Sequence, residues 1–193
     1  MSQMLKSTNQ NFEYILKDLH IFLIASFDTI SHALTISIYA LDKFKEVWEK
    51  LKSEVLKVIK SQDDITRENI DEISYLTYFF NEAIRFDEPA PRIFPVEAKA
   101  NVEINGVNIL KGTWVNLNFP GLAKNKNEWQ SPDKFIPERW DPTSPYFKTP
   151  SGKNRSFNSL GTFGFGIRRC PGEFLAKLEA KIFLIFIILN YWW

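Results

Sequence analysis

The sequence predicts a mainly α-helical fold with a small β-sheet. Neither proline nor glycine occurs early in the chain, since the first proline is Pro89 and the first glycine is Gly106. Segments free of these residues form long helices, whereas segments rich in them form turns and irregular loops. All 10 Pro and 8 Gly therefore fall in a second part of strand and coil, which a final apolar helix follows. Apolar residues make up 45% of the 193 residues, which is typical of a globular chain with a core.

The composition also excludes several classes of function. A net charge of +1 gives no basic surface of the kind that binds nucleic acid, so we expect no such partner. A single cysteine excludes an internal disulfide and any zinc or iron–sulfur site built from several cysteines. The two histidines, His20 and His32, make a histidine-built metal site unfavourable.

The first helix is predicted at Ile21–Leu41, a segment that holds 14 apolar residues together with Asp28 and several hydroxyl side chains. An aspartate in the middle of a bilayer costs about 2.5–3.5 kcal/mol. We therefore expect a helix buried in protein, with one polar stripe, rather than a membrane span. No apolar stretch follows Met1–Lys6 directly, so no secretory signal is predicted there.

The next two helical segments are Asp42–Ser61 and Ile65–Phe86, and the second is expected to break near Ser74. Apolar residues in Asp42–Ser61 recur at steps of three and four, which indicates an amphipathic helix. Its charges alternate in sign, which favours a solvated surface over a basic docking face.

Short-range signals organise the second part of the chain. Glu97–Leu117 alternates in polarity around Asn105 and Gly106, a pair typical of the tight turn of a β-hairpin. Glu128–Ser151 contains five prolines and is predicted to be ordered coil. The last helix is expected at Glu173–Trp193.

The strongest chemical signal is the glycine-rich loop Phe163–Gly172, which carries the lone Cys170 to the start of the last helix. Glycines permit positive φ and the close approach of a flat ligand. Amide donors at a helix start stabilise a thiolate, and Arg168 adds positive charge. Such a thiolate is a metal ligand or a nucleophile. A nucleophile lacks a nearby base in this sequence, because both histidines lie far upstream. The alternative is a buried structural cysteine after a tight turn.

This loop resembles the haem-binding loop of the cytochrome P450 monooxygenases, which reads Phe-Gly-x-Gly-x-Arg-x-Cys-x-Gly. Three other motifs resemble signatures of that family and occur in its order: Glu82-Ala83-Ile84-Arg85, Pro137-Glu138-Arg139-Trp140 and Ala25-Ser26-Phe27-Asp28-Thr29. The resemblance implies a partial cytochrome P450 fold. Thr162 departs from the family pattern, because proline commonly precedes the phenylalanine of the loop.

The resemblance implies that Cys170 holds the iron of haem b as a thiolate. Arg168 is then expected to pair with a haem propionate, and Phe163 to pack beside the sulfur. Gly164 and Gly166 belong to the same cofactor-binding loop. For Phe163, plain core packing is an alternative that is compatible with the first role.

Asp28 and Thr29 correspond to the acid–alcohol pair on the distal side of the haem in that family. The hydroxyl is expected to hold dioxygen or water, and the carboxylate to relay protons. The alternative is that Thr29 donates to the carbonyl one turn earlier, with Asp28 in an ion pair.

Glu82, Arg85 and Arg139 are expected to form one buried ion network that clamps the proline-rich segment and so fixes the Cys170 loop. Their role is structural. Alone, Glu-x-x-Arg is a weak motif that better fits an i, i+3 ion pair on a helix surface.

The resemblance implies an oxidoreductase that inserts one atom of dioxygen into an apolar small molecule, with electrons from an NADPH-dependent reductase. Family members are more than twice as long. Residues 1–193 are therefore expected to be the C-terminal portion of the domain, without its N-terminal half and last strands. The alternative is a truncated, non-catalytic fragment that binds haem or a partner. A full-length relative is expected at the endoplasmic reticulum membrane, but this chain is expected to contain neither anchor nor signal.

Overall fold

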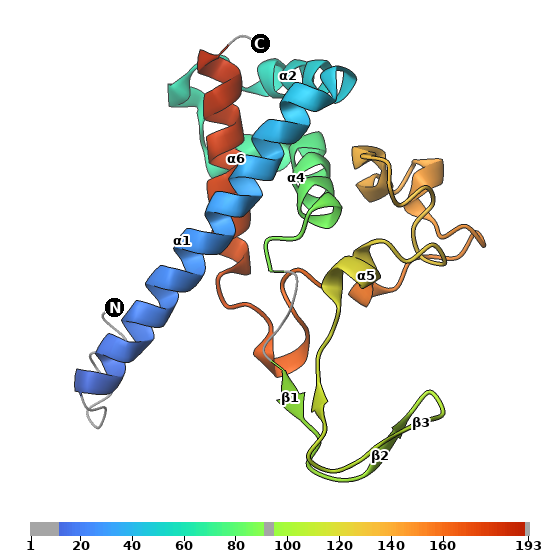
Figure 1. Cartoon of the computed structure of the whole chain (residues 1–193). Coiled ribbons are helices and arrows are strands. Elements are labelled where there is room, and N and C mark those ends of the chain that lie inside the picture. Colours follow the sequence, from blue (N-terminus) through green and yellow to red (C-terminus); the bar gives the residue numbers. More distant parts are fainter. Residues whose placement is uncertain (1–11, 91–94, 192–193) are drawn as a thin grey trace.

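The computed structural model describes residues 12–90 and 95–191, and within them the chain is mainly helical (Figure 1). The predicted fold class is therefore confirmed. Met1–Lys6, where no secretory signal is expected, lies outside the described residues. The helices are α1 Phe12–Lys43, α2 Lys45–Val58, α3 Arg67–Glu72, α4 Ser74–Phe86, α5 Phe119–Ala123 and α6 Glu173–Asn190.

The β-structure consists of two small antiparallel sheets in the described residues. Strand β1 (Val96–Glu97) pairs with β4 (Trp114–Val115), and β2 (Val102–Ile104) pairs with β3 (Val107–Ile109). The turn between β2 and β3 places Asn105 at φ 50° and Gly106 at φ 80°, as the Asn-Gly pair predicts. This hairpin extends away from the helices (Figure 1).

The core lies where the C-terminal half of α1 meets α2, α4 and α6 (Figure 1). Trp48, Leu51 and Val55 recur on one face of α2 and are fully buried there. The break predicted near Ser74 is confirmed, since α3 ends at Glu72 and the buried Ile73 separates it from α4. Between α5 and α6 the chain forms short 3₁₀ turns and coil, as its prolines predict.

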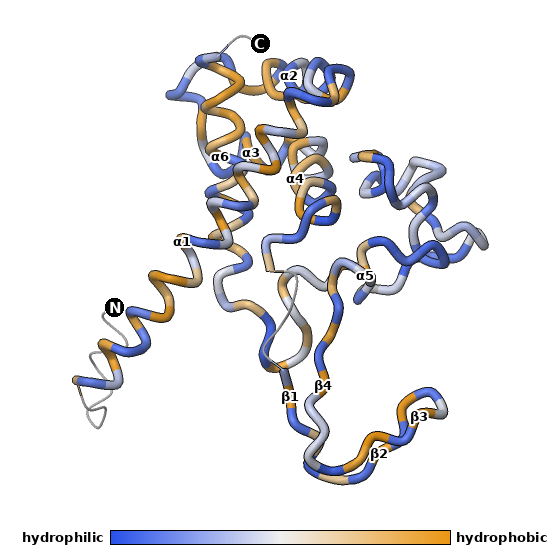
Figure 2. The backbone as a smooth tube through the Cα atoms, in the orientation of Figure 1, coloured by the Kyte–Doolittle hydropathy of each residue, from blue (hydrophilic) through white to orange (hydrophobic). Residues whose placement is uncertain are grey.

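Helix α1 is longer and more exposed than the sequence indicates. It begins at Phe12, and its N-terminal half extends beyond the other helices (Figures 1 and 2). Large apolar side chains such as Ile24 and Phe27 are about two-thirds exposed or more, at 68% and 73%. The expectation of a buried helix is correct only for the segment that contains Ala33, Ile36 and Ala40.

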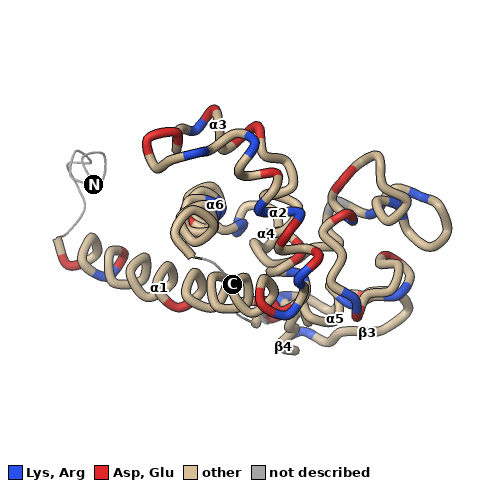
Figure 3. Tube along the Cα trace, turned by 90° about the horizontal axis from the view of Figure 1, so that it is seen from above, with Lys and Arg blue, Asp and Glu red and all other residues tan. Residues whose placement is uncertain are grey.

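The expectation that the chain contains no candidate anchor is wrong. Helix α1 has 32 residues, is long and apolar enough to cross a membrane, and only 17% of its most apolar window is buried. Figure 3 shows few charged residues along α1 compared with α2. The hydroxyl groups that argued against a span donate to carbonyls of the same helix, so their polarity is largely satisfied internally. These donors are Ser26, Thr29, Ser31, Thr35 and Ser37.

Candidate functional site

The three side chains predicted to form an ion network lie together and are almost completely buried. Glu82 accepts two hydrogen bonds from Arg85, at 2.8 Å each, from Nε to Oε2 and from Nη2 to Oε1. Arg139 Nε donates to Glu82 Oε1 at 3.1 Å. Because both ion pairs have side chains that are 0% exposed, the alternative of a surface pair on α4 is wrong.

The network also ties α4 to the irregular segment that follows α5. Arg85 Nη1 donates to the carbonyls of Ala123 and Pro132, at 2.8 and 2.9 Å. Glu82 accepts from the backbone N–H of Ile136 at 2.8 Å and from the indole of Trp140 at 3.2 Å. The two buried guanidinium groups thereby satisfy several backbone carbonyls, and the carboxylate satisfies a backbone N–H and an indole N–H.

The loop that carries Cys170 is closed by two backbone hydrogen bonds. The N–H of Cys170 donates to the carbonyl of Phe163 at 2.8 Å, and the N–H of Gly164 donates to that of Gly161 at 2.7 Å. Gly164 and Gly166 have φ of 70° and 61°, where a side chain is strained. The thiol of Cys170 is exposed beside the start of α6, so the alternative of a buried structural cysteine is wrong.

Gly161 is a second constraint on this loop, and the sequence analysis does not identify it. A Cβ at this position would lie 2.4 Å from Cδ1 of Phe119, which is buried in α5. A glycine is therefore required by close packing and not by its φ. The glycine-rich composition of the loop is the only signal in the sequence, and it does not separate Gly161 from its neighbours.

Two other predicted residues of the loop have different environments. Arg168 is exposed and forms no ion pair with the residues that the structure describes. Phe163 is half-buried and packs against a small core cluster of Ala33, Phe80, Ile84 and Ala180. The side chain of Phe163 thus packs in the core, while its backbone carbonyl contacts Cys170.

Thr29 has the geometry of the alternative role, in which its hydroxyl bonds within the helix. Its hydroxyl donates to the carbonyl of Ala25 at 2.7 Å. Asp28 is exposed and forms no ion pair within the described part of the chain. Ile30 and Leu34, which follow on α1, pack against the same core cluster as Phe163. The cluster therefore brings this part of α1 next to the Cys170 loop.

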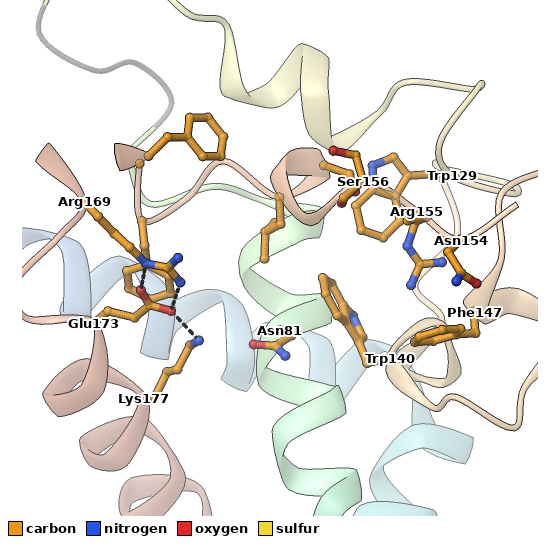
Figure 4. A pocket seen from close by; sticks show the side chains of 15 residues that line it. Asn81, Trp129, Trp140, Phe147, Asn154, Arg155, Ser156, Arg169, Glu173 and Lys177 are labelled. Carbon is orange, nitrogen blue, oxygen red and sulfur yellow. Dashed lines mark hydrogen bonds and ion pairs between the residues drawn. The ribbon is translucent and has the colours of Figure 1, made fainter. Parts of the chain in front are cut away.

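A cavity of about 360 Å³ lies beside the loop, between α4, α6 and the irregular segment (Figure 4). On its α6 side, Glu173 accepts from Arg169 at 2.6 and 2.9 Å and from Lys177 at 2.7 Å. These hydrogen bonds lower the pKa of Glu173 to about 2. On the far side, the Arg155 guanidinium lies 4.6 Å from the centre of the Trp129 ring. Sequence reasoning does not predict these groups, because tertiary packing brings them together.

The residues around Cys170 fit a haem group. The site offers one exposed thiol and, two residues away, an exposed guanidinium at Arg168. Ile167 and Phe174, three and four residues from Cys170 in the chain, are fully exposed and 61% exposed, so apolar side chains close to the cysteine in sequence are open to a ligand. In residues 12–90 and 95–191, no group of three or more His, Cys, Asp or Glu is arranged to hold a metal ion. Cys170 is the single cysteine of the sequence, and its sulfur is exposed to a ligand.

Comparisons with known proteins agree with this geometry. Cytochrome P450 71B14 of Arabidopsis thaliana is 35% identical over 89% of this chain and 33% of its own length. Rhazimal synthase of Alstonia scholaris is 29% identical over 98% of this chain and 36% of its own length. The crystal structure of the cytochrome P450DA heme domain superposes with a TM-score of 0.80 at 27% identity, over 95% of this chain and 40% of that one.

The chain thus spans about a third of the length of the curated relatives that it matches. The model of the cytochrome P450 family matches residues 1–193, which is the whole of the sequence. Sequence, fold and the cysteine loop therefore agree, and the chain belongs to the cytochrome P450 family.

Proposed function

We propose that this chain is the haem-ligating, C-terminal portion of a monooxygenase. The observation that carries the proposal is the exposed thiol of Cys170, which the glycine loop holds at the start of α6. Membership of the family supports it. The chain spans about a third of the length of its relatives, so monooxygenase activity is a proposal for this chain.

Haem bound at this site supplies the activation of dioxygen. Cys170 is the thiolate ligand, and Arg168 holds a propionate by a charge-assisted hydrogen bond. Phe163 excludes water from one side of the sulfur. The positive φ of Gly164 and Gly166 turns the backbone so that no side chain fills the space in front of the loop.

On the other side of the site, the carboxylate of Asp28 would relay protons toward the bound group. Thr29 orients water or dioxygen once its hydroxyl leaves the Ala25 carbonyl. The substrate is an apolar small molecule, which the exposed apolar face of α1 near Phe27 suits. The electrons come from an NADPH-dependent reductase, as is general in the family.

The test is the absorption spectrum of the reduced, haem-loaded chain with carbon monoxide. We expect the red-shifted band of thiolate ligation in the wild type and its loss in Cys170→Ala. Arg168→Gln is the matched comparison, because it keeps the thiol and is expected to weaken haem binding without moving the band. An unchanged spectrum in Cys170→Ala would contradict the proposal.

A second candidate is a non-catalytic fragment that binds haem or a partner. The observation that favours it is that the chain covers about a third of the length of its relatives. Product formation distinguishes the two candidates. Turnover of an apolar substrate by the 193-residue chain with reductase and NADPH excludes the fragment reading. Haem binding without turnover supports it, and leaves catalysis to a longer chain.

A further inference from the structure

A hydrogen bond joins the end of α4 to the start of the Cys170 loop. Glu88 lies two residues beyond the last residue of α4 and is only 5% exposed. Its Oε1 accepts from the hydroxyl of Thr162 at 3.3 Å. Its Oε2 is buried without a hydrogen-bond partner among the described residues. A buried carboxyl with one weak contact and one unsatisfied oxygen calls for an explanation.

Thr162 is placed so that its position affects the cysteine. It directly precedes Phe163, whose carbonyl accepts the hydrogen bond from the Cys170 N–H. On its other side, Gly161 is held against the ring of Phe119. A displacement of Thr162 therefore moves the acceptor of the hydrogen bond that closes the loop. A proline at this position would have no hydroxyl with which to make this contact.

Within residues 12–90 and 95–191, no group forms an ion pair with the carboxyl of Glu88. Glu88 borders a cavity of about 320 Å³ that His32, Arg85, Asp87 and Lys124 also line. His32 of α1 lies 3.5 Å from Asp87, and the Arg85 guanidinium is directed at Glu82 and at backbone carbonyls. Lys124, which follows α5, forms no ion pair with Glu88.

Burial raises the pKa of Glu88 to about 7, although the Thr162 hydroxyl and the charge of Arg85 oppose the rise. A carboxyl whose pKa is higher in the folded state than in the unfolded state is stabilising when it is protonated. Its contribution is complete below pH 4.5 and is lost as the pH rises through about 7.

We propose that Glu88 is a positioning residue that tethers the Cys170 loop to α4 through Thr162, and that ionisation of Glu88 loosens the tether. The consequence for haem ligation rests on the proposed function. The tether itself is a property of the chain without haem. Ionised Glu88 is the better acceptor for the Thr162 hydroxyl, but the cost of burying the charge outweighs this one weak contact, because Oε2 has no partner among the described residues. The charge therefore draws water into the cavity and shifts the loop toward an open state, whereas protonated Glu88 keeps the cavity closed and Thr162 in place.

The test is hydrogen exchange of the Cys170 and Gly164 amides in the haem-free, 193-residue chain, compared between wild type and Glu88→Gln at each pH. Glutamine keeps an acceptor for Thr162 and does not ionise. We expect equal exchange at pH 5 and about ten- to a hundredfold faster exchange in the wild type at pH 8. Comparison at the same pH removes the intrinsic pH dependence of exchange.

Two further variants isolate the contact. Thr162→Val removes the donor at nearly constant volume and is expected to speed exchange several-fold at pH 5. In that background, Glu88→Gln should have no further effect on the loop amides. Histidines also change charge close to neutral pH, so a His32→Asn variant is the control, and its loop is expected to keep the pH response of the wild type.

Equal exchange of the loop amides in wild type and Glu88→Gln at pH 8 overturns the proposal. Unchanged exchange of these amides in Thr162→Val at pH 5 also overturns it. Thermal unfolding of each variant shows whether a change is local or global. Failure of haem to bind Cys170 contradicts the proposed function and leaves these exchange results intact, so the two failures are distinguishable.

Discussion

The ion network around Glu82 and the loop around Cys170 differ in how completely the chain surrounds them. Glu82, Arg85 and Arg139 are at most 1% exposed, and their polar atoms bond to one another and to backbone groups. Cys170 and Arg168 are exposed, and glycines at positive φ keep the neighbouring space empty.

This difference in exposure distinguishes the ion network, which is structural, from the Cys170 loop, which is the candidate site. A buried, mutually satisfied set of charges has one geometry, because any displacement leaves a charge without a partner. The thiol of Cys170 is exposed, on a loop in which Gly164 and Gly166 adopt positive φ without strain. The network therefore fixes α4 to the segment that follows α5, and the exposed thiol of Cys170 is the part of the site that a ligand can reach.

The largest expected effect is in the network. Glu82→Gln leaves two buried guanidinium groups without a carboxylate and is expected to lower the free energy of unfolding by about 3–5 kcal/mol. Denaturant unfolding measures it. Glu54→Gln, at an exposed ion pair of α2, is the control and is expected to change it by no more than about 0.5 kcal/mol. A similar loss in both variants would remove the distinction between the regions.

A smaller loss of stability is expected where the Cys170 loop packs against α5. Gly161→Ala forces its Cβ against the ring of Phe119 and is expected to cost about 1–3 kcal/mol through overpacking. A double-mutant cycle with Phe119→Leu checks the cause, because the smaller side chain relieves the clash. If the two costs add without coupling, the contact between Gly161 and Phe119 does not constrain the loop.

The smallest effect concerns the surface beside the loop and depends on pH. The pKa of Glu173 is lowered to about 2 from 4.5, so its ion pairs stabilise the fold above pH 4.5 and are lost as the pH falls through about 2. We expect a contribution of about 1 kcal/mol, because solvent screens the exposed Arg169. Unfolding of wild type and Glu173→Gln, compared between pH 7 and pH 2, measures it. If the difference in free energy of unfolding between the two proteins were the same at both pH values, the stabilising role of the Glu173 ion pairs would be contradicted.

Local signals in the sequence predicted the local parts of the fold. Asn105 and Gly106 specify their hairpin by backbone preference alone, and the break between α3 and α4 follows from the local pattern around Ser74. The cysteine loop and the three members of the ion network were found through motifs. The cysteine loop and the pair Glu82 and Arg85 have a fixed local spacing, whereas Arg139, 57 residues from Glu82, was assigned to the network through the family resemblance.

Features that depend on distant residues were missed. The sequence does not show that Gly161 meets Phe119 or that Thr162 meets Glu88, because each contact joins segments far apart in the chain. The exposure of α1 was also missed, because its apolar composition fits a buried helix and an exposed one equally well. Burial is a property of the tertiary structure, and a single sequence gives it only indirectly.

The most direct test of the account is a titration of the 193-residue chain with haem, followed by the absorption of the bound group. The account predicts saturation at one haem per chain through the exposed Cys170, and no stoichiometric binding in Cys170→Ala at unchanged helix content. Equal binding by the wild type and Cys170→Ala would contradict the claim that this loop is the ligand site.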